Sequence, residues 1–308
     1  MITKQIIENG LYGLAIGDAL GVPYEFRNRE LLAAAPCTDM VGGGTYNKPA
    51  GTWSDDTSMT LASMDGLINP WTGGTFDKIM RKFAAWLTYG EYTIDGVFGA
   101  GCTCRKAVGR YLGGTFPTGG TDEYDNGNGS LMRILPAVLF EMAVGATPAF
   151  LDGICALTHG HAISKISCRI YANVVKGILE NNKQIKERLS AVIHKTETQG
   201  QRAFDRLRSA TFFSLPECEI RSGGYVIDTL EAALWCFYNT GNFRDCVLKA
   251  VNLGSDTDTT AAVAGSLAGL YYGKENIPEP WLKTLRGKEL LDKLIARFHY
   301  LAIENPFR

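Results

Sequence analysis

Two short acidic motifs near opposite ends of the chain constrain its fold more than any other feature. The first is Ser-Asp-Asp-Thr at 54–57, and the second is Asp-Thr-Asp-Thr at 256–259. Each opens into an apolar stretch with the pattern of a helix. Carboxylate and hydroxyl oxygens are the ligands that Mg²⁺ and Mn²⁺ prefer. Four carboxylates brought together without cations would repel one another, so a fold that joins the two helix starts favours bound metal.

Helix capping is the alternative explanation of both motifs, because Ser, Thr and Asp are favoured N-caps and acidic residues suit a first helical turn. A cap needs one residue, however, and each motif has more. If Ser54 caps the first helix, Asp55 and Asp56 remain unexplained; if Asp256 caps the second, Asp258 remains. Spacing alone leaves both explanations open.

Composition excludes some classes of function. The chain has 308 residues, a net charge of −1 and 45% hydrophobic residues, enough for a large core in one domain or two. It has no Lys/Arg run and no acidic tail, so we expect no nucleic-acid surface. A small anionic ligand, held by a few groups or by metal, remains possible.

The cysteines and the apolar stretches indicate the compartment. Eight cysteines are sparse in a chain of this length, and they lack the spacing of a zinc site. The first ten residues lack the apolar core of a signal peptide. The most apolar stretch, 261–272, is too short to span a bilayer. We therefore expect a soluble cytoplasmic protein with reduced thiols and no membrane segment.

Helical periodicity dominates the sequence, and we find no reliable strand pattern. We expect an all-α fold of about a dozen helices, with 28–52 and 113–129 as loops. Small residues from Ala261 to Gly269 predict a central helix packed closely on all sides, which would place Asp256 and Asp258 in the middle of the fold. No linker or repeat divides the chain, so the prediction is one domain over 1–308. The predicted helices cover 6–20, 56–68, 76–88, 131–143, 148–157, 162–180, 184–194, 226–239, 243–253, 257–272 and 288–300.

Four segments together resemble the ADP-ribosylglycohydrolase family, whose enzymes remove ADP-ribose from modified acceptors. They are GLAIGDALGVPYEF at 13–26, GTWSDDT at 51–57, NGNGSLMR at 126–133 and LGSDTDTT at 253–260. Each is moderately specific, whereas all four in order over nearly the whole chain are strongly specific. Ser54 stands where the family usually has Thr, and both side chains offer a hydroxyl oxygen.

The resemblance implies a compact, orthogonal all-α bundle around two Mg²⁺ or Mn²⁺ ions, and an ADP-ribosylated protein or small molecule as substrate. It implies that Asp258 bridges the two ions. Glu25 and Asp125 would be catalytic, near the scissile bond. The implied metal ligands are Ser54, Asp55, Asp56, Asp256, Asp258 and Thr259, and the implied substrate contacts are Asn128, Gly129, His159 and Tyr225.

Each of these residues outside the metal motifs also has a plain structural explanation. Glu25 follows a turn, where a solvated glutamate is common, and Asp125 and Asn128 lie in a sequence typical of turns. His159 and Tyr225 could serve packing alone. We expect Asp18 to hydrogen-bond within its own turn rather than to act directly.

Three functions fit these observations. The first is a metal-dependent hydrolase of the glycosidic bond between ADP-ribose and arginine, serine or another acceptor. The second is a non-catalytic relative that binds ADP-ribose or serves structurally, although all four motif aspartates are present. The third is a two-metal hydrolase of another substrate, such as a phosphoester.

Overall fold

The computed structural model describes residues 1–68, 74–181 and 184–305. Within them the chain forms fourteen α-helices, joined by loops and single turns of 3-10 helix, and no β-strand, which confirms the predicted all-α class. The helices are α1 (Lys4–Gly21), α2 (Arg29–Ala34), α3 (Asp55–Gly66), α4 (Thr75–Tyr89), α5 (Cys102–Leu112), α6 (Leu135–Val144), α7 (Pro148–Ala156), α8 (Ala162–Asn181), α9 (Ile185–Lys195), α10 (Val226–Tyr238), α11 (Phe243–Asn252), α12 (Thr257–Tyr272), α13 (Glu279–Thr284) and α14 (Lys288–Phe298).

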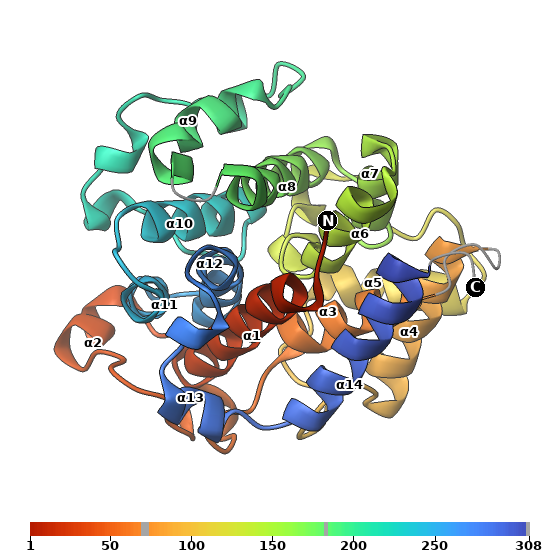
Figure 1. Cartoon of the computed structure of the whole chain (residues 1–308), viewed down its shortest axis with the longest axis horizontal. Helices are drawn as coiled ribbons and strands as arrows, with labels where there is room; N and C mark the ends of the chain where they lie inside the picture. Colours follow the sequence, from red (N-terminus) through yellow and green to blue (C-terminus); the bar gives the residue numbers. More distant parts are fainter. Residues whose placement is uncertain (69–73, 182–183, 306–308) are drawn as a thin grey trace.

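The contact between α1 and α12 organises the molecule (Figure 1). Glycines recur every four residues on one face of α1, and α12 presents small residues with the same spacing. A Cβ atom added to Gly13 would lie 2.2 Å from the carbonyl oxygen of Gly265, and one on Gly17 would lie 2.0 Å from that of Ala261. The two backbones therefore touch, which any larger side chain would prevent.

This close approach sets where the second acidic motif lies. At the end of α1, a Cβ on Gly21 would lie 2.3 Å from the Cα of Asp258, so the first turn of α12 rests against the last turn of α1. Every residue of α12 from Thr257 to Leu270 is buried. The predicted central helix is thus confirmed, with Asp258 buried and Asp256 half-buried at its start.

The other helices surround this pair. Helices α8, α10 and α11 lie on one side of α12, and α3, α4 and α14 lie beyond α1 (Figure 1). The buried apolar side chains form one cluster that reaches from Ile2 to Ala302. A single domain over 1–308 stays a prediction, since its last three residues and the segments 69–73 and 182–183 lie outside the described residues.

Three helices, α2, α5 and α13, were not predicted. Helix α2 lies inside the expected loop 28–52, buries only Leu32, and begins where the Asn28 side chain accepts a hydrogen bond from the Leu31 N–H, at 2.9 Å. Helix α13 is likewise short and buries only Trp281. Helix α5 was missed although its apolar residues Cys104, Ala107 and Val108 recur at helical spacing. The helix expected from residue 131 begins at Leu135 instead, after a turn.

Across the described residues, every helix is too short or too polar to cross a membrane.

We predict that Gly17→Ala destabilises the protein by roughly 3 kcal/mol, because its Cβ would meet the backbone of α12, which cannot move aside as a flexible side chain can. Gly109→Ala is the matched control. Gly109 is exposed inside α5 and its added Cβ would meet nothing within 4 Å, so this change should stabilise by up to about 1 kcal/mol. Urea unfolding of both variants checks the prediction. Equal stability of Gly17→Ala and the wild type would contradict it.

Candidate metal centre and substrate cavity

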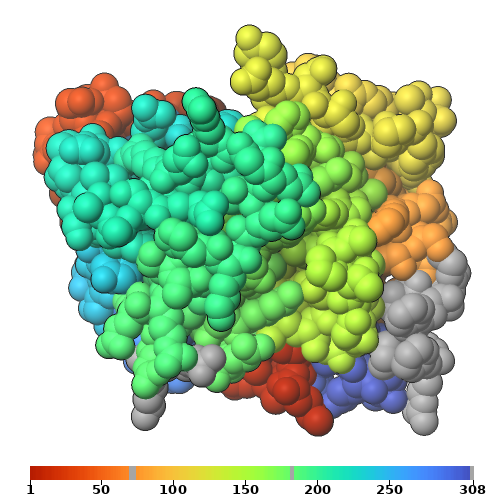
Figure 2. Space-filling view, turned by 90° about the horizontal axis from the view of Figure 1, so that it is seen from above, coloured from red at the N-terminus to blue at the C-terminus, as the bar shows by residue number. Residues whose placement is uncertain are grey.

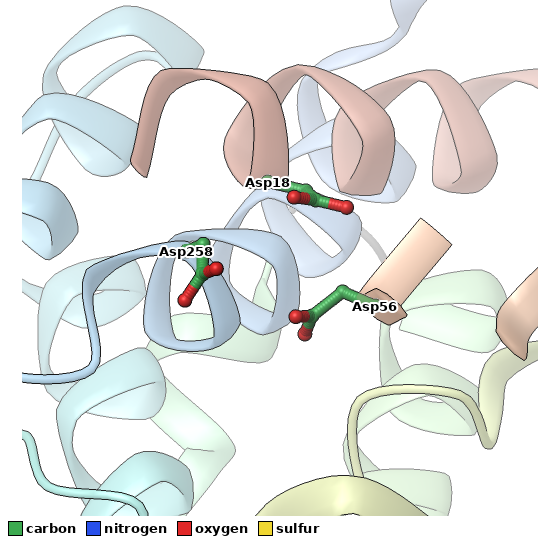
Figure 3. A group of neighbouring side chains, drawn as sticks. All are labelled: Asp18, Asp56 and Asp258. Carbon is green, nitrogen blue, oxygen red and sulfur yellow. The ribbon is translucent and has the colours of Figure 1, made fainter. Parts of the chain in front are cut away.

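Carboxylates from three helices converge at the centre of the fold. Asp18 of α1, Asp56 of α3 and Asp258 of α12 each offer an oxygen within 4.8 Å of the others, and all three are buried. Figure 3 shows these side chains facing a common space. Glu25, Asp256 and Asp258 form a second such group. Asp258 is common to both, so the two acidic motifs meet as predicted.

The first motif combines capping with a surplus of charge. Ser54 caps α3, since its Oγ accepts a hydrogen bond from the Asp56 N–H at 3.2 Å. The same Oγ donates to Asp56 Oδ2 at 3.0 Å, and Thr259 Oγ1 donates to that oxygen at 3.2 Å. Capping therefore explains Ser54, while Asp56 is held toward the second motif.

Capping does not explain the second motif. Asp256 occupies the N-cap position of α12, but its side chain accepts no capping hydrogen bond from that helix. Its Oδ2 accepts instead from Asn128 Nδ2, at 2.8 Å. The Asn128 amide also donates to Thr229 Oγ1, at 2.8 Å. Asn128 thus fixes the position of Asp256 from a different loop.

The cluster is electrostatically strained in the absence of cations. Burial raises the pKa of Asp55, Asp56 and Asp258 well above the usual range, and the neighbouring carboxylates raise it further. In the described part of the chain, Glu25 Oε2, Asp56 Oδ1 and Asp256 Oδ1 are buried oxygens that accept no hydrogen bond. Buried, unpartnered carboxylate oxygens are what a hard divalent cation requires. The residues present therefore fit Mg²⁺ or Mn²⁺.

Asp18 has a different role from the one we expected. Its carboxylate bonds outside its own turn: it accepts from the backbone N–H groups of Ser54 and Thr57, and from Thr57 Oγ1 at 2.6 Å. Burial raises its pKa to about 6, although these hydrogen bonds oppose the shift. Asp18 anchors the first motif to α1. The available signal was its place on the apolar stripe of the first helix, three residues after Ala15.

A cavity of about 280 Å³ opens beside the acids. The predicted residues that line it are Glu25, Asp55, Asn128, Gly129, His159, Asp256, Asp258 and Thr259. Asp56, which belongs to the carboxylate cluster, and Ser54 do not line the cavity. Glu25 is buried, and burial, followed by the charge of Asp256, raises its pKa to about 7.

Asp125 and Tyr225 were predicted for the site but do not line this cavity. Asp125 is buried under its own loop, where its Oδ2 accepts from the Asp122 N–H at 3.3 Å. It borders a neighbouring hollow that shares Cys102 and Thr103 with the cavity. Tyr225 is 39% exposed and borders a second hollow, which shares Gly127 and Gly224 with the cavity. Both residues adjoin the site rather than enter it.

The cavity also has walls that sequence reasoning missed, from Gly99 and from the start of α5. Gly99 has a φ of +77°, and a Cβ there would lie 2.4 Å from Asp55 Oδ1. Phe26 stands at the rim with 71% of its surface exposed and a φ of +67°. Its N–H donates to the Ser255 carbonyl at 2.7 Å, which holds the loop after Glu25 against the second motif. Figure 2 shows the yellow segment between α5 and α6 projecting beyond the neighbouring surface.

We predict that Asp56→Asn stabilises the metal-free protein by on the order of 2 kcal/mol, because it removes one of several mutually repelling charges. When Mn²⁺ or Mg²⁺ reaches 100 times its dissociation constant, the free energy of unfolding of the wild type should rise by about 2.7 kcal/mol. That of the variant should rise much less. Thermal unfolding with and without cation measures both effects.

Asp205→Asn, which changes an exposed aspartate outside the cluster, is the control and should respond to the cation as the wild type does. A wild type that gains no stability from either cation would contradict the assignment of a metal centre.

Comparison with known proteins gives one consistent family. The family model for ADP-ribosylglycohydrolase matches residues 3–306. The chain is 35% identical to ADP-ribosylarginine hydrolase Tri1 of Serratia proteamaculans (strain 568), over 97% of this chain and 80% of that protein. It is 32% identical to ADP-ribosyl-[dinitrogen reductase] glycohydrolase of Rhodospirillum rubrum, over 89% and 87%.

A solved structure agrees with these sequence matches. The structure of an ADP-ribosylglycohydrolase-related protein complex superimposes with a TM-score of 0.81 and 30% identity, covering 97% of this chain and 98% of that one. The joined acidic motifs, the helical fold and the match along the chain agree with one another. This chain belongs to the ADP-ribosylglycohydrolase family.

Proposed function

We propose that this protein is a metal-dependent hydrolase that cleaves the glycosidic bond between ADP-ribose and an acceptor, with protein arginine as the first acceptor to test. The observation that carries the proposal is the meeting of two acidic motifs, with unpartnered buried oxygens, at the wall of a cavity lined by glycine loops. The family match supports the same chemistry.

The proposed cofactor is a pair of Mg²⁺ or Mn²⁺ ions. When bound, they would supply positive charge to hold vicinal ribose hydroxyls and to stabilise negative charge near the reacting atoms. The residues that would hold them are Ser54, Asp55, Asp56, Asp256, Asp258 and Thr259.

Glu25 is the first proposed catalytic carboxylate. It lines the cavity, and its buried Oε2 accepts no hydrogen bond in the described structure. Its carboxylate oxygen lies within 4.8 Å of those of Asp256 and Asp258. Cleavage at the anomeric carbon requires a water to be delivered and a proton to be transferred. Glu25 would accept the proton from the attacking water.

The shape of the site supports a proposed set of substrate contacts. We place the ribose of the scissile bond in the cavity, beside Asn128, Gly129 and His159. The backbone N–H groups of this glycine-rich loop would meet the pyrophosphate. The adenosine would extend into the adjoining hollow of about 480 Å³, where Tyr124 and Tyr225 offer aromatic surface for stacking.

The mouth of the cavity supports arginine as the acceptor. Phe26 presents an exposed ring beside Glu25, and a guanidinium group binds favourably over an aromatic face. Two of the similar proteins are named for ADP-ribosylarginine and for ADP-ribosylated dinitrogen reductase. A cytoplasmic location is part of the proposal, since all eight cysteines are free thiols, as a reducing compartment favours.

A panel of substrates tests the proposed function. Purified protein is incubated with ADP-ribosyl-arginine, ADP-ribosyl-serine and a generic phosphoester, each with Mg²⁺, with Mn²⁺ or with EDTA. We expect cation-dependent release of ADP-ribose, fastest from the arginine conjugate. Binding of ADP-ribose without turnover would identify a non-catalytic relative, and hydrolysis of the phosphoester alone would identify a different two-metal enzyme.

We predict that Glu25→Gln lowers kcat by roughly 10²–10⁴-fold, the usual contribution of general acid–base catalysis, with ADP-ribose affinity nearly unchanged. Steady-state kinetics and calorimetric titration of ADP-ribose provide the two measurements. The control, Glu30→Gln, changes an exposed glutamate of α2 and should keep wild-type kinetics. Equal losses of rate and of affinity in Glu25→Gln would instead mark a ground-state contact.

Asp125 is the second proposed catalytic carboxylate, and Asp125→Asn should lower kcat by a similar factor without altering the melting temperature. The control is Asp205→Asn, which makes the same change at an exposed aspartate outside the cavity and both hollows and should behave as the wild type. Because Asp125 accepts a hydrogen bond within its own loop, a purely structural role would appear as a lower melting temperature with an unchanged kcat. That result would remove Asp125 from the mechanism.

A further inference from the structure

Arg133 carries a buried charge that the proposed mechanism does not use. Its side chain is fully buried, and its guanidinium lies over the Phe83 ring, 4.6 Å from the centroid. Nη2 donates to the Ile154 carbonyl and to Thr158 Oγ1, while Nε and Nη1 have no partner in the described structure. Burial lowers the pKa of the Arg133 guanidinium, and the nearby thiols oppose this shift. Burying such a cation is costly. The hydrogen bond of Arg133 to the Thr158 side chain therefore calls for an explanation.

That contact leads to the cavity through Thr158. Arg133 Nη2 donates to Thr158 Oγ1 at 2.7 Å, and the same oxygen lies 2.7 Å from Nδ1 of His159. A threonine hydroxyl has one proton and two acceptor lone pairs, and the hydrogen bond from Arg133 occupies one of those lone pairs. The hydroxyl proton is therefore available for a neighbour that can accept it.

Two neighbours compete for this proton: His159 Nδ1 and the Cys104 thiol, which is also within hydrogen-bonding reach of Thr158. An imidazole nitrogen is the stronger acceptor, because thiol sulfur accepts only weakly. The cation that donates to the hydroxyl oxygen also polarises the O–H bond toward donation. Donation of the hydroxyl proton to Nδ1 would leave the ring proton of His159 on Nε2.

The opposite edge of the His159 ring faces the cavity. A Cβ added to Gly127 would lie 3.4 Å from Nε2, and one added to Gly129 would lie 3.0 Å from Cε1. Glycine at these positions therefore keeps larger side chains away from this edge. Burial, together with the nearby charge of Arg133, lowers the pKa of His159 to about 3, so the ring is neutral at physiological pH.

From this geometry we infer that Arg133 and Thr158 are positioning residues, which hold His159 as a neutral imidazole that presents its Nε2–H to an oxygen of the ligand in the cavity. A neutral imidazole N–H can orient the ligand oxygen by a hydrogen bond. It does so without adding a positive charge that would interact with the carboxylates of the site. The ligand part of this inference rests on the proposed function, with ADP-ribose as the source of the acceptor oxygen. The tautomer of His159 does not depend on it.

Nitrogen NMR of the ligand-free protein tests the tautomer. The chain has four histidines, so ¹⁵N-histidine labelling gives a simple spectrum, and His159→Gln assigns the His159 signals. We expect Nε2 to carry the proton and the ring to stay neutral between about pH 5 and 8. Thr158→Ser should keep this pattern, and Thr158→Val should lose it. A wild-type ring protonated at Nδ1 would overturn the inference.

Binding of ADP-ribose tests whether the Nε2–H of His159 donates a hydrogen bond to the ligand. Thr158→Val should weaken the binding of ADP-ribose roughly tenfold, the loss expected for one hydrogen bond. Thr158→Ser should bind ADP-ribose as tightly as the wild type does. Thr118→Val is the matched control. It removes another buried hydroxyl, which donates to the Leu157 carbonyl at 2.7 Å, and should keep both the tautomer and the affinity.

The two ideas fail in different ways. If the wild type binds no ADP-ribose, the proposed function fails while the NMR result still decides the tautomer. If the wild type and both Thr158 variants bind ADP-ribose equally, the positioning role is refuted and the proposed function stands. Arg133→Met adds an independent measurement: where it folds, removal of the cation should raise the pH at which His159 takes up a proton, and an unchanged titration would contradict the role of Arg133.

Discussion

The backbone contact between α1 and α12 is the constraint on which the rest of the structure depends. Glycines at 13, 17 and 21 allow the two helices to touch, so the end of α1 meets the start of α12. That meeting places Asp18 beside Asp258. Asp18 in turn accepts hydrogen bonds from the first acidic motif. A contact made by residues with almost no side chain therefore determines where the charged side chains gather.

The charge cluster and the fold oppose each other energetically. Several carboxylates lie buried together, where burial and mutual repulsion favour their protonated forms. The packing of the three helices supplies the free energy that holds them in this arrangement, and a bound divalent cation would reverse the sign of the interaction. In this respect the site resembles other functional centres, where strain is retained because the surrounding core maintains the geometry.

Sequence reasoning predicted the fold class, most of the long helices and the meeting of the two acidic motifs, because each depends on local pattern and residue chemistry. It did not predict α2 or α13, which are six residues long and bury one residue each. It also missed α5, although the apolar residues of that helix recur at helical spacing. It expected the hydrogen-bond partners of Asp18 within the turn of Asp18 itself, whereas the donors are Ser54 and Thr57. A buried carboxylate accepts hydrogen bonds from groups that tertiary packing brings near it, and these can be distant in the sequence. Its catalytic role for Asp125 stays a proposal.

The sequence by itself determined which atoms are available: the oxygen ligands of two motifs, the small residues that let two helices approach, and the glycine loops around a cavity. The tertiary structure alone decided how those atoms are used. It assigned capping to Ser54 but not to Asp256, separated Tyr225 from the cavity that holds His159, and linked His159 to Arg133 through Thr158. The reason is physical. Residue type and spacing fix chemistry and local conformation, whereas burial, hydrogen-bond partners and electrostatic environment arise only when distant segments pack together.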